Sequence, residues 1–205
     1  PHDCVWTVDP IDGTTNFVNG FPMFAASIGV LQRGRPVVGA VWCSTGHALR
    51  PGVYHASSGG KFRFENSDVT PKLNPAVRRR LAGVPTVAVH DKNWETRKTG
   101  SAAIECAFVA AGMLRVARFE SPNIWDVAGG IALVEAAGGT VTALQIDAGV
   151  EADVAKLVET ATSSYGGLDV AFANAGIIGD MGGIFEIDPA TMAEMQNPAP
   201  PAARP

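Results

Sequence analysis

Short apolar runs separated by turn residues fill the first third of the chain, and this pattern predicts an antiparallel sheet. Two of the runs flank the segment Arg-Gly-Arg-Pro at 33–36, which predicts a hairpin. A Ser-Ser-Gly-Gly turn at 57–60 separates two shorter runs. The predicted strands are residues 4–9, 23–32, 37–43, 53–56 and 61–64.

Helical spacing of apolar residues characterises the second half of the chain. A helix is predicted to begin at the N-cap Ser101 and to end near residue 111. Another follows Asn123 and ends at a glycine pair, and an amphipathic helix spans 151–165. The remaining predicted strands are residues 85–90, 113–119, 138–141, 143–147 and 168–173.

Residues 65–98 show no clear period, and we interpret their basic run, Arg78 to Arg80, as a solvated helix face. A contact with a substrate phosphate is the alternative for these arginines.

Composition narrows the function classes. The chain of 205 residues has a net charge of −4, which does not suggest a nucleic-acid-binding surface. No apolar run approaches the roughly 18 residues that a membrane span needs, so we expect a cytoplasmic protein. The three cysteines, Cys4, Cys43 and Cys106, are far apart in sequence and are expected to be buried free thiols.

Three aspartates carry the candidate chemistry. Asp9 and Asp12 follow an apolar run and precede a Gly-Thr-Thr turn, and Asp126 stands at the start of an apolar helix. Carboxylate oxygens suit hard cations such as Mg²⁺, and a Gly-Thr turn that opens a helix offers N–H donors to an anion. These residues therefore predict a site for a metal and a phosphate ester, although aspartates also serve as ordinary turn residues.

Two segments carry a family resemblance. WTVDPIDGTTNFVNGFP (6–22) and WDVAGGIALVEAAGG (125–139) resemble the signature segments of the inositol monophosphatase family of Mg²⁺-dependent phosphatases. The resemblance covers about residues 4–141. It implies an α+β fold, a layered α/β sandwich that is incomplete at its N-terminus, and a possible homodimer. It also implies a phosphate monoester of inositol or a similar sugar or polyol as the small-molecule substrate.

The same resemblance implies a role for each site residue. Asp9 would bridge two metal ions, the Ile11 carbonyl would be a further ligand, and Asp12 and Asp126 would complete the second metal's shell. Asp9, Asp12 and Thr14 would be catalytic, with Thr14 helping to orient a metal-activated water for in-line attack. The substrate-binding set would be Gly13, Thr14, Gly100, Ser101, Ala102, Glu120 and Asp126. Two tryptophans, Trp6 and Trp125, are expected in the core beside the aspartates.

The character of the chain changes near residue 142. The segment GGLDVAFANAG (166–176) resembles part of a short-chain dehydrogenase/reductase, which implies an appended Rossmann-like βαβ fragment over 142–195. The chain has no Gly-rich cofactor turn and no Tyr-x-x-x-Lys pair, so an NAD(P)-dependent oxidoreductase is the weaker alternative. We predict three regions: 1–141, 142–195 and a disordered Pro/Ala-rich tail at 196–205.

The chain starts with Pro1, eight residues before Asp9. The family places a further Glu ligand on a helix upstream of that aspartate. We therefore expect an N-terminally truncated, chimeric chain whose phosphatase activity is weak or absent. A catalytically inactive fusion or fragment product is the alternative.

Overall fold

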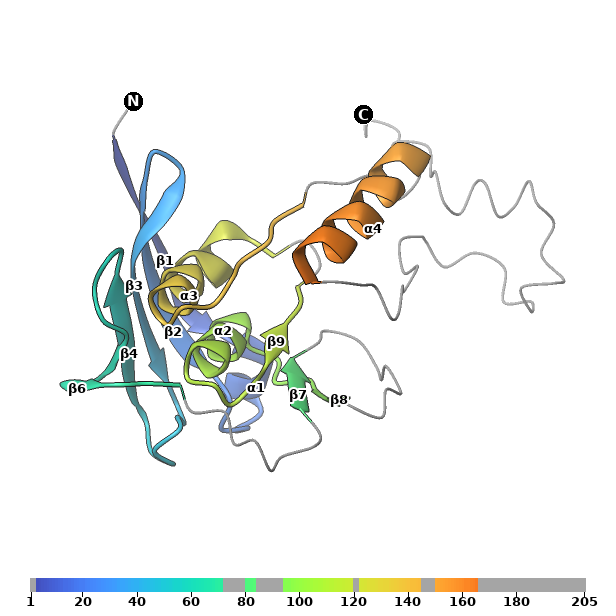
Figure 1. Cartoon of the computed structure of the whole chain (residues 1–205). Helices are drawn as coiled ribbons and strands as arrows, with labels where there is room; N and C mark the ends of the chain where they lie inside the picture. The colour runs from blue at the N-terminus through green and yellow to red at the C-terminus, as the bar shows by residue number, and fades with distance from the viewer. Residues whose placement is uncertain (1–2, 72–79, 84–93, 120–121, 145–149, 166–205) are drawn as a thin grey trace, which may run out of the picture. The chain divides into compact units, whose positions relative to one another are not determined.

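The computed structural model describes residues 3–71, 80–83, 94–119, 122–144 and 150–165 (Figure 1). The chain divides into two compact units, Pro1–Val141 and Thr142–Pro205. In the second unit the structure describes α4 (Glu151–Tyr165), with the bounds that the sequence predicts. The elements of the first unit are β1 (Cys4–Asp12), α1 (Thr14–Val18), β2 (Ala25–Gln32), β3 (Arg35–Cys43), β4 (Gly52–Ser57), β5 (Arg63–Phe64), β6 (Ser67–Asp68), β7 (Arg80–Gly83), β8 (Trp94–Arg97), α2 (Ala102–Ala110), β9 (Val116–Ala117) and α3 (Ile124–Ala136).

Strands β1 to β6 form an antiparallel sheet in which each strand pairs with its neighbours in sequence. The predicted hairpin is confirmed: β2 and β3 pair, and Arg33 and Gly34 between them both have positive φ, 50° and 79°. Positive φ at both central residues matches the twist of the flanking strands. β1 extends three residues beyond the prediction, to Asp12.

Helices α2 and α3 cover one face of this sheet, and β7, β8 and β9 form a second, parallel sheet next to α2 (Figure 1). This arrangement confirms the α+β class for the first unit. Glycines allow α3 to lie directly on the strands. A Cβ atom at Gly39 of β3 would fall 2.1 Å from the Gly129 carbonyl oxygen of α3, and one at Gly29 of β2 would fall 2.8 Å from the Gly129 nitrogen.

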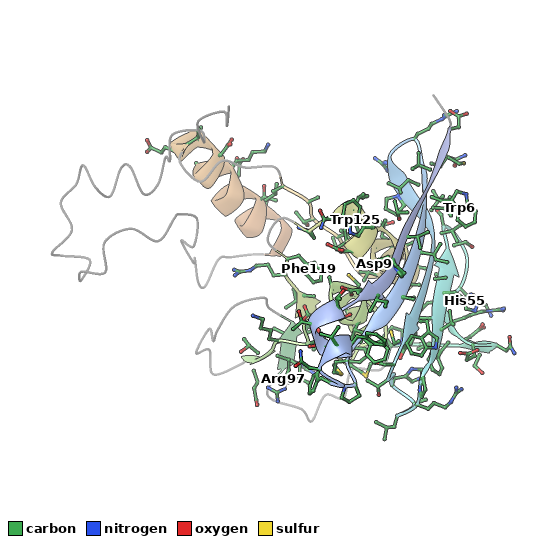
Figure 2. All side chains as sticks on the ribbon, turned by 180° about the vertical axis from the view of Figure 1, so that it is seen from behind. Trp6, Asp9, His55, Arg97, Phe119 and Trp125 are labelled. Carbon is green, nitrogen blue, oxygen red and sulfur yellow. The ribbon has the colours of Figure 1, made fainter. Side chains whose placement is uncertain are left out.

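The outer face of β1 is exposed, which corrects the prediction for Trp6. Its side chain is 70 % exposed, and Figure 2 shows it on the face of the sheet away from Trp125 and Asp9. Thr7 takes the buried position next to it, because neighbouring residues of a strand point to opposite faces. Trp125, at the start of α3, is 47 % exposed and is likewise not a core residue.

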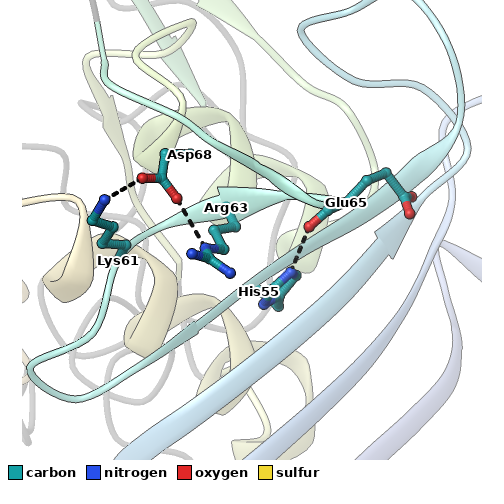
Figure 3. Close-up of polar contacts among 5 residues, drawn as sticks. All are labelled: His55, Lys61, Arg63, Glu65 and Asp68. Carbon is teal, nitrogen blue, oxygen red and sulfur yellow. Dashed lines mark hydrogen bonds and ion pairs between the residues drawn. The ribbon is translucent and has the colours of Figure 1, made fainter.

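Polar contacts fasten the short strands at the edge of the sheet (Figure 3). The Asp68 carboxylate accepts from Lys61 Nζ and, at 2.9 Å, from Arg63 Nε. His55 Nε2 lies 2.7 Å from the Glu65 carbonyl oxygen. Because the Lys61, Arg63 and Asp68 side chains are exposed, these ion pairs contribute little to stability.

Some of the other predictions are corrected, and some lie outside the described residues. Arg80 begins β7 rather than lying on a helix, the strand predicted at 113–119 shrinks to Val116–Ala117, and residues 138–141 belong to no strand. Cys4 is exposed, although Cys43 and Cys106 are buried as expected. The predictions for 85–90, 168–173 and the tail lie outside the described residues. In the part of the chain that the structure describes, no helix is both long enough and apolar enough to span a membrane.

Candidate metal centre

An irregularity in β1 brings its two aspartates to one side. Residues three apart in a regular strand point to opposite faces. Here Asp9 pairs with Ser27 and Asp12 pairs with Ala25, so three steps along β1 match two steps along β2. The extra residue is a β-bulge, and it turns the Asp9 and Asp12 side chains toward the same face of the sheet.

The third aspartate comes from α3. Asp126 is the third residue of the helix, and its Oδ2 accepts from the backbone N–H of the N-cap Asn123 at 2.8 Å. The Asn123 side-chain nitrogen lies 3.2 Å from the same oxygen. This capping arrangement fixes the carboxylate at the helix start, and the glycine contacts hold α3 directly on β2 and β3.

The three carboxylates form one cluster. One oxygen from each of Asp9, Asp12 and Asp126 lies within 4.8 Å of the others. Among the residues that the structure describes, no other group of three His, Cys, Asp or Glu side chains is close enough to share a metal ion. Asp9 and Asp126 are half-buried and Asp12 is buried, so the cluster is partly accessible to solvent.

Electrostatics in the cluster favour a bound cation. Burial raises the pKa of Asp9, and the Asp126 carboxylate adds to this effect. Burial also raises the pKa of Asp12, while hydrogen bonds from Ser101 and Ala103 partly offset the rise. Carboxylates that repel one another in this way are the hard oxygen ligands that Mg²⁺, Mn²⁺ and Ca²⁺ prefer, so the donor set fits a divalent cation.

Asp12 is held by the start of α2. Its Oδ2 accepts from the Ser101 hydroxyl and from the Ala103 backbone N–H, both at 2.6 Å. The same hydroxyl accepts from the Ile104 N–H at 3.2 Å, which confirms Ser101 as the N-cap of the helix. Both fixed bonds end on Oδ2, so Oδ1 can serve a metal ion.

The turn after β1 holds the predicted phosphate-binding residues. The Thr14 hydroxyl donates to the Ile11 carbonyl oxygen at 2.8 Å, and this oxygen keeps a second lone pair. Gly13 has φ +81°, and a Cβ atom there would lie 3.0 Å from the Met23 carbonyl oxygen. A side chain at position 13 would therefore strain the turn and crowd the segment that precedes β2.

The other predicted substrate residues differ in their placement. Gly100 is exposed and has φ +78°, and Ala102 is half-buried. Ser101 is only 2 % exposed, with its hydroxyl turned toward Asp12. Glu120 lies outside the described residues.

Several residues that support the site were not predicted from the sequence. Asn16 donates through Nδ2 to the carbonyl oxygens of Met23, at 2.6 Å, and Thr99, at 2.7 Å, and so joins the turn after β1 to the segment before α2. Glu105 is buried in α2 and accepts from Thr99. A charged residue within the apolar run of that helix was a usable signal for Glu105. The backbone contact of Ala103 leaves no trace in the sequence.

Comparisons with known proteins agree with this geometry. A sequence model of the inositol monophosphatase family matches residues 1–173, which passes the boundary predicted near 141. Inositol-1-monophosphatase ImpA of Mycolicibacterium smegmatis is 34 % identical over 159 residues, covering 68 % of this chain and 56 % of the relative. Fructose-1,6-bisphosphatase/inositol-1-monophosphatase of Thermotoga maritima is 30 % identical over 149 residues, covering 68 % and 57 %.

Solved structures give the same result. Inositol monophosphatase from Anabaena (Nostoc) sp. PCC 7120 superposes with a TM-score of 0.58 at 28 % identity, over 69 % of this chain and 61 % of that one. The chain thus spans little more than half the length of these relatives.

Proposed function

Because the chain belongs to the inositol monophosphatase family, we propose that its carboxylate cluster is the Mg²⁺ site of a phosphomonoesterase. The observation that carries the proposal is the convergence of Asp9, Asp12 and Asp126 from two distant segments, with one oxygen from each within 4.8 Å of the others. The names of the relatives support a phosphorylated polyol or sugar as the substrate, with inositol phosphate as the first choice.

Four residues would hold the metal: the three aspartates and Ile11 through its carbonyl oxygen. When bound, Mg²⁺ would lower the pKa of a coordinated water and neutralise charge on phosphoryl oxygens. The chain itself keeps the ligands in place before a metal arrives. Asp12 is fixed by Ser101 and Ala103, Asp126 by its helix cap, and Asp9 accepts from the Ile11 N–H at 3.0 Å.

The phosphate would lie beside the turn at Gly13 and Thr14. N–H groups in the first turn of a helix have no partner within that helix, so they are available to phosphate oxygens. The Thr14 hydroxyl, which donates to the Ile11 carbonyl oxygen, would orient a water nucleophile. Gly100, Ser101, Ala102 and Glu120 remain the proposed contacts for the alcohol part of the substrate, with Asp126.

Isotope labelling tests the proposed chemistry. The purified chain would be incubated with inositol 1-phosphate, or with fructose 1,6-bisphosphate, and Mg²⁺ in H₂¹⁸O. Attack of water on phosphorus places one ¹⁸O atom in the released phosphate, at a rate above that of Asp9→Asn. Asp68→Asn, which alters an exposed carboxylate at the sheet edge, is the matched control and should behave like the parent chain. Label in the alcohol, or equal rates for the parent and Asp9→Asn, would refute the proposal.

A further inference from the structure

One buried carboxylate lies close to the metal cluster but is not one of its three members. Glu105 in α2 is 4 % exposed, and its Oε1 accepts from the Thr99 backbone N–H at 3.2 Å and from the Thr99 hydroxyl at 2.9 Å. A buried carboxylate is costly unless hydrogen bonds compensate for its lost hydration. Its presence in an otherwise apolar helix therefore calls for an explanation.

Thr99 links Glu105 to the turn that precedes α2. Its hydroxyl accepts from the Ser101 N–H at 3.2 Å and has two acceptors within reach, Glu105 Oε1 at 2.9 Å and the Ser101 carbonyl oxygen at 3.0 Å. Its carbonyl oxygen accepts from Asn16 at 2.7 Å. Gly100, between Thr99 and Ser101, has φ +78°, and a Cβ atom there would meet the Asn16 side chain at 2.9 Å. The turn is thus fixed at the N–H, the hydroxyl and the carbonyl of one residue.

The same turn determines where Ser101 points. The Ser101 hydroxyl donates to Asp12 at 2.6 Å, so an unbroken chain of hydrogen bonds runs from Glu105 through Thr99 and Ser101 to Asp12. An ordinary capping box would use the third residue of the helix, but that residue is Ile104, and Glu105 instead reaches back to two residues before the N-cap. Ser101 can cap the helix without the hydrogen bonds between Thr99 and Glu105.

We infer that Glu105, acting through Thr99, is a positioning residue that holds the Asp12 carboxylate in its metal-binding orientation. The inference rests on the proposed function, since it takes Asp12 as a metal ligand. Residues that orient a ligand from behind affect metal affinity even though they never touch the metal. A purely structural residue would affect folding stability alone.

Measurement of metal affinity distinguishes a positioning role for Glu105 from a purely structural one. Mn²⁺, which favours the same oxygen ligands as Mg²⁺, would be titrated into the chain and its free fraction measured by electron paramagnetic resonance. Glu105→Leu removes the acceptor and should weaken Mn²⁺ binding about 10- to 100-fold, whereas Glu105→Gln keeps an acceptor oxygen and should stay within about threefold. The matched control is Glu65→Leu, which removes a carboxylate that accepts from the Val53 N–H at 2.7 Å in another part of the sheet.

Thr99 supplies an independent pair of variants that nearly conserve side-chain volume. Thr99→Val removes the hydroxyl and should weaken Mn²⁺ binding as Glu105→Leu does, and Thr99→Ser should restore it. Parent-like affinity in folded Glu105→Leu or Thr99→Val would overturn the inference. If the parent binds Mn²⁺ but releases no phosphate from inositol 1-phosphate, the proposed function fails and the positioning result still stands. A parent chain that binds no Mn²⁺ would overturn both.

Discussion

Substitution of Gly39 by alanine should displace α3 and thereby disturb the metal centre. The new Cβ atom would lie 2.1 Å from the Gly129 carbonyl oxygen and 3.1 Å from the Ala132 Cβ atom. Contacts of a Cβ atom below 3.0 Å essentially never occur, so the helix and the strand must separate by about 0.9 Å. Asp126 lies one turn before Gly129 on the same helix and must move with it.

The size of this movement sets the expected effect. A misplacement of about 1 Å at a reacting group costs about 10²-fold in rate, which corresponds to about 2.7 kcal/mol. Overpacking of the interface between helix and sheet should also lower the free energy of unfolding by about 1–3 kcal/mol. Urea unfolding followed by circular dichroism measures the stability, and Mn²⁺ titration together with phosphate release measures the state of the site.

The neighbouring residue supplies the control for this prediction. Ala40 is on the same strand but points to the opposite face, so Ala40→Val adds volume without touching α3. It should leave Mn²⁺ affinity and phosphate release unchanged. If Gly39→Ala bound Mn²⁺ and released phosphate as the parent does, the close approach of α3 would not be what positions Asp126.

Three further predictions concern the carboxylates and the turn beside them. Asp12→Asn should abolish Mn²⁺ binding yet stabilise the metal-free chain by about 1 kcal/mol, because carboxylates about 5 Å apart repel one another; lower stability of this variant in urea would contradict the explanation. The pKa values of Asp9 and Asp12 are raised in the folded chain. Above the ordinary pKa of 3.8, the folded, metal-free chain therefore binds more protons than the unfolded chain. The contribution of these two carboxyl groups to stability should decline as pH rises through their folded pKa values. Mn²⁺ affinity should change in the opposite sense and fall as pH is lowered through the same values, and a pH-independent affinity in calorimetric titrations would argue against these ligands. Asn16→Ala removes two side-chain hydrogen bonds and should lower the free energy of unfolding by about 1–3 kcal/mol, whereas an unchanged urea midpoint would show that the bonds to Met23 and Thr99 contribute nothing net.

Local signals predicted much of the first unit. The alternation of apolar runs and turns predicted β1 to β5, and the N-cap Ser101 predicted the start of α2, because strand periodicity and helix capping depend on residues close in sequence. Residue chemistry alone made the three aspartates candidates, but assigning them to one metal site depended on the resemblance, since nothing local distinguishes Asp126 from an ordinary helix cap.

The errors arose where a residue's environment depends on distant parts of the chain. Trp6 alternates correctly along β1, but sequence alone does not say which face of a sheet the helices will cover. The second sheet was missed because β7, β8 and β9 are two to four residues long and pair in parallel across long connections. The bulge between Asp9 and Asp12 was also missed, since it is defined by the register with β2.

The dependence of phosphate release on Mg²⁺ concentration tests the central claim most directly. Inositol 1-phosphate would be supplied to the parent chain and to Asp126→Asn while Mg²⁺ is varied from zero to saturation. We predict that the parent releases phosphate slowly, as expected of a chain without the upstream Glu ligand, with a saturating dependence on Mg²⁺, and that Asp126→Asn remains at the metal-free background throughout. Phosphate release that is independent of Mg²⁺, or equal in the two proteins, would contradict the assignment of Asp9, Asp12 and Asp126 as the metal centre of a phosphomonoesterase.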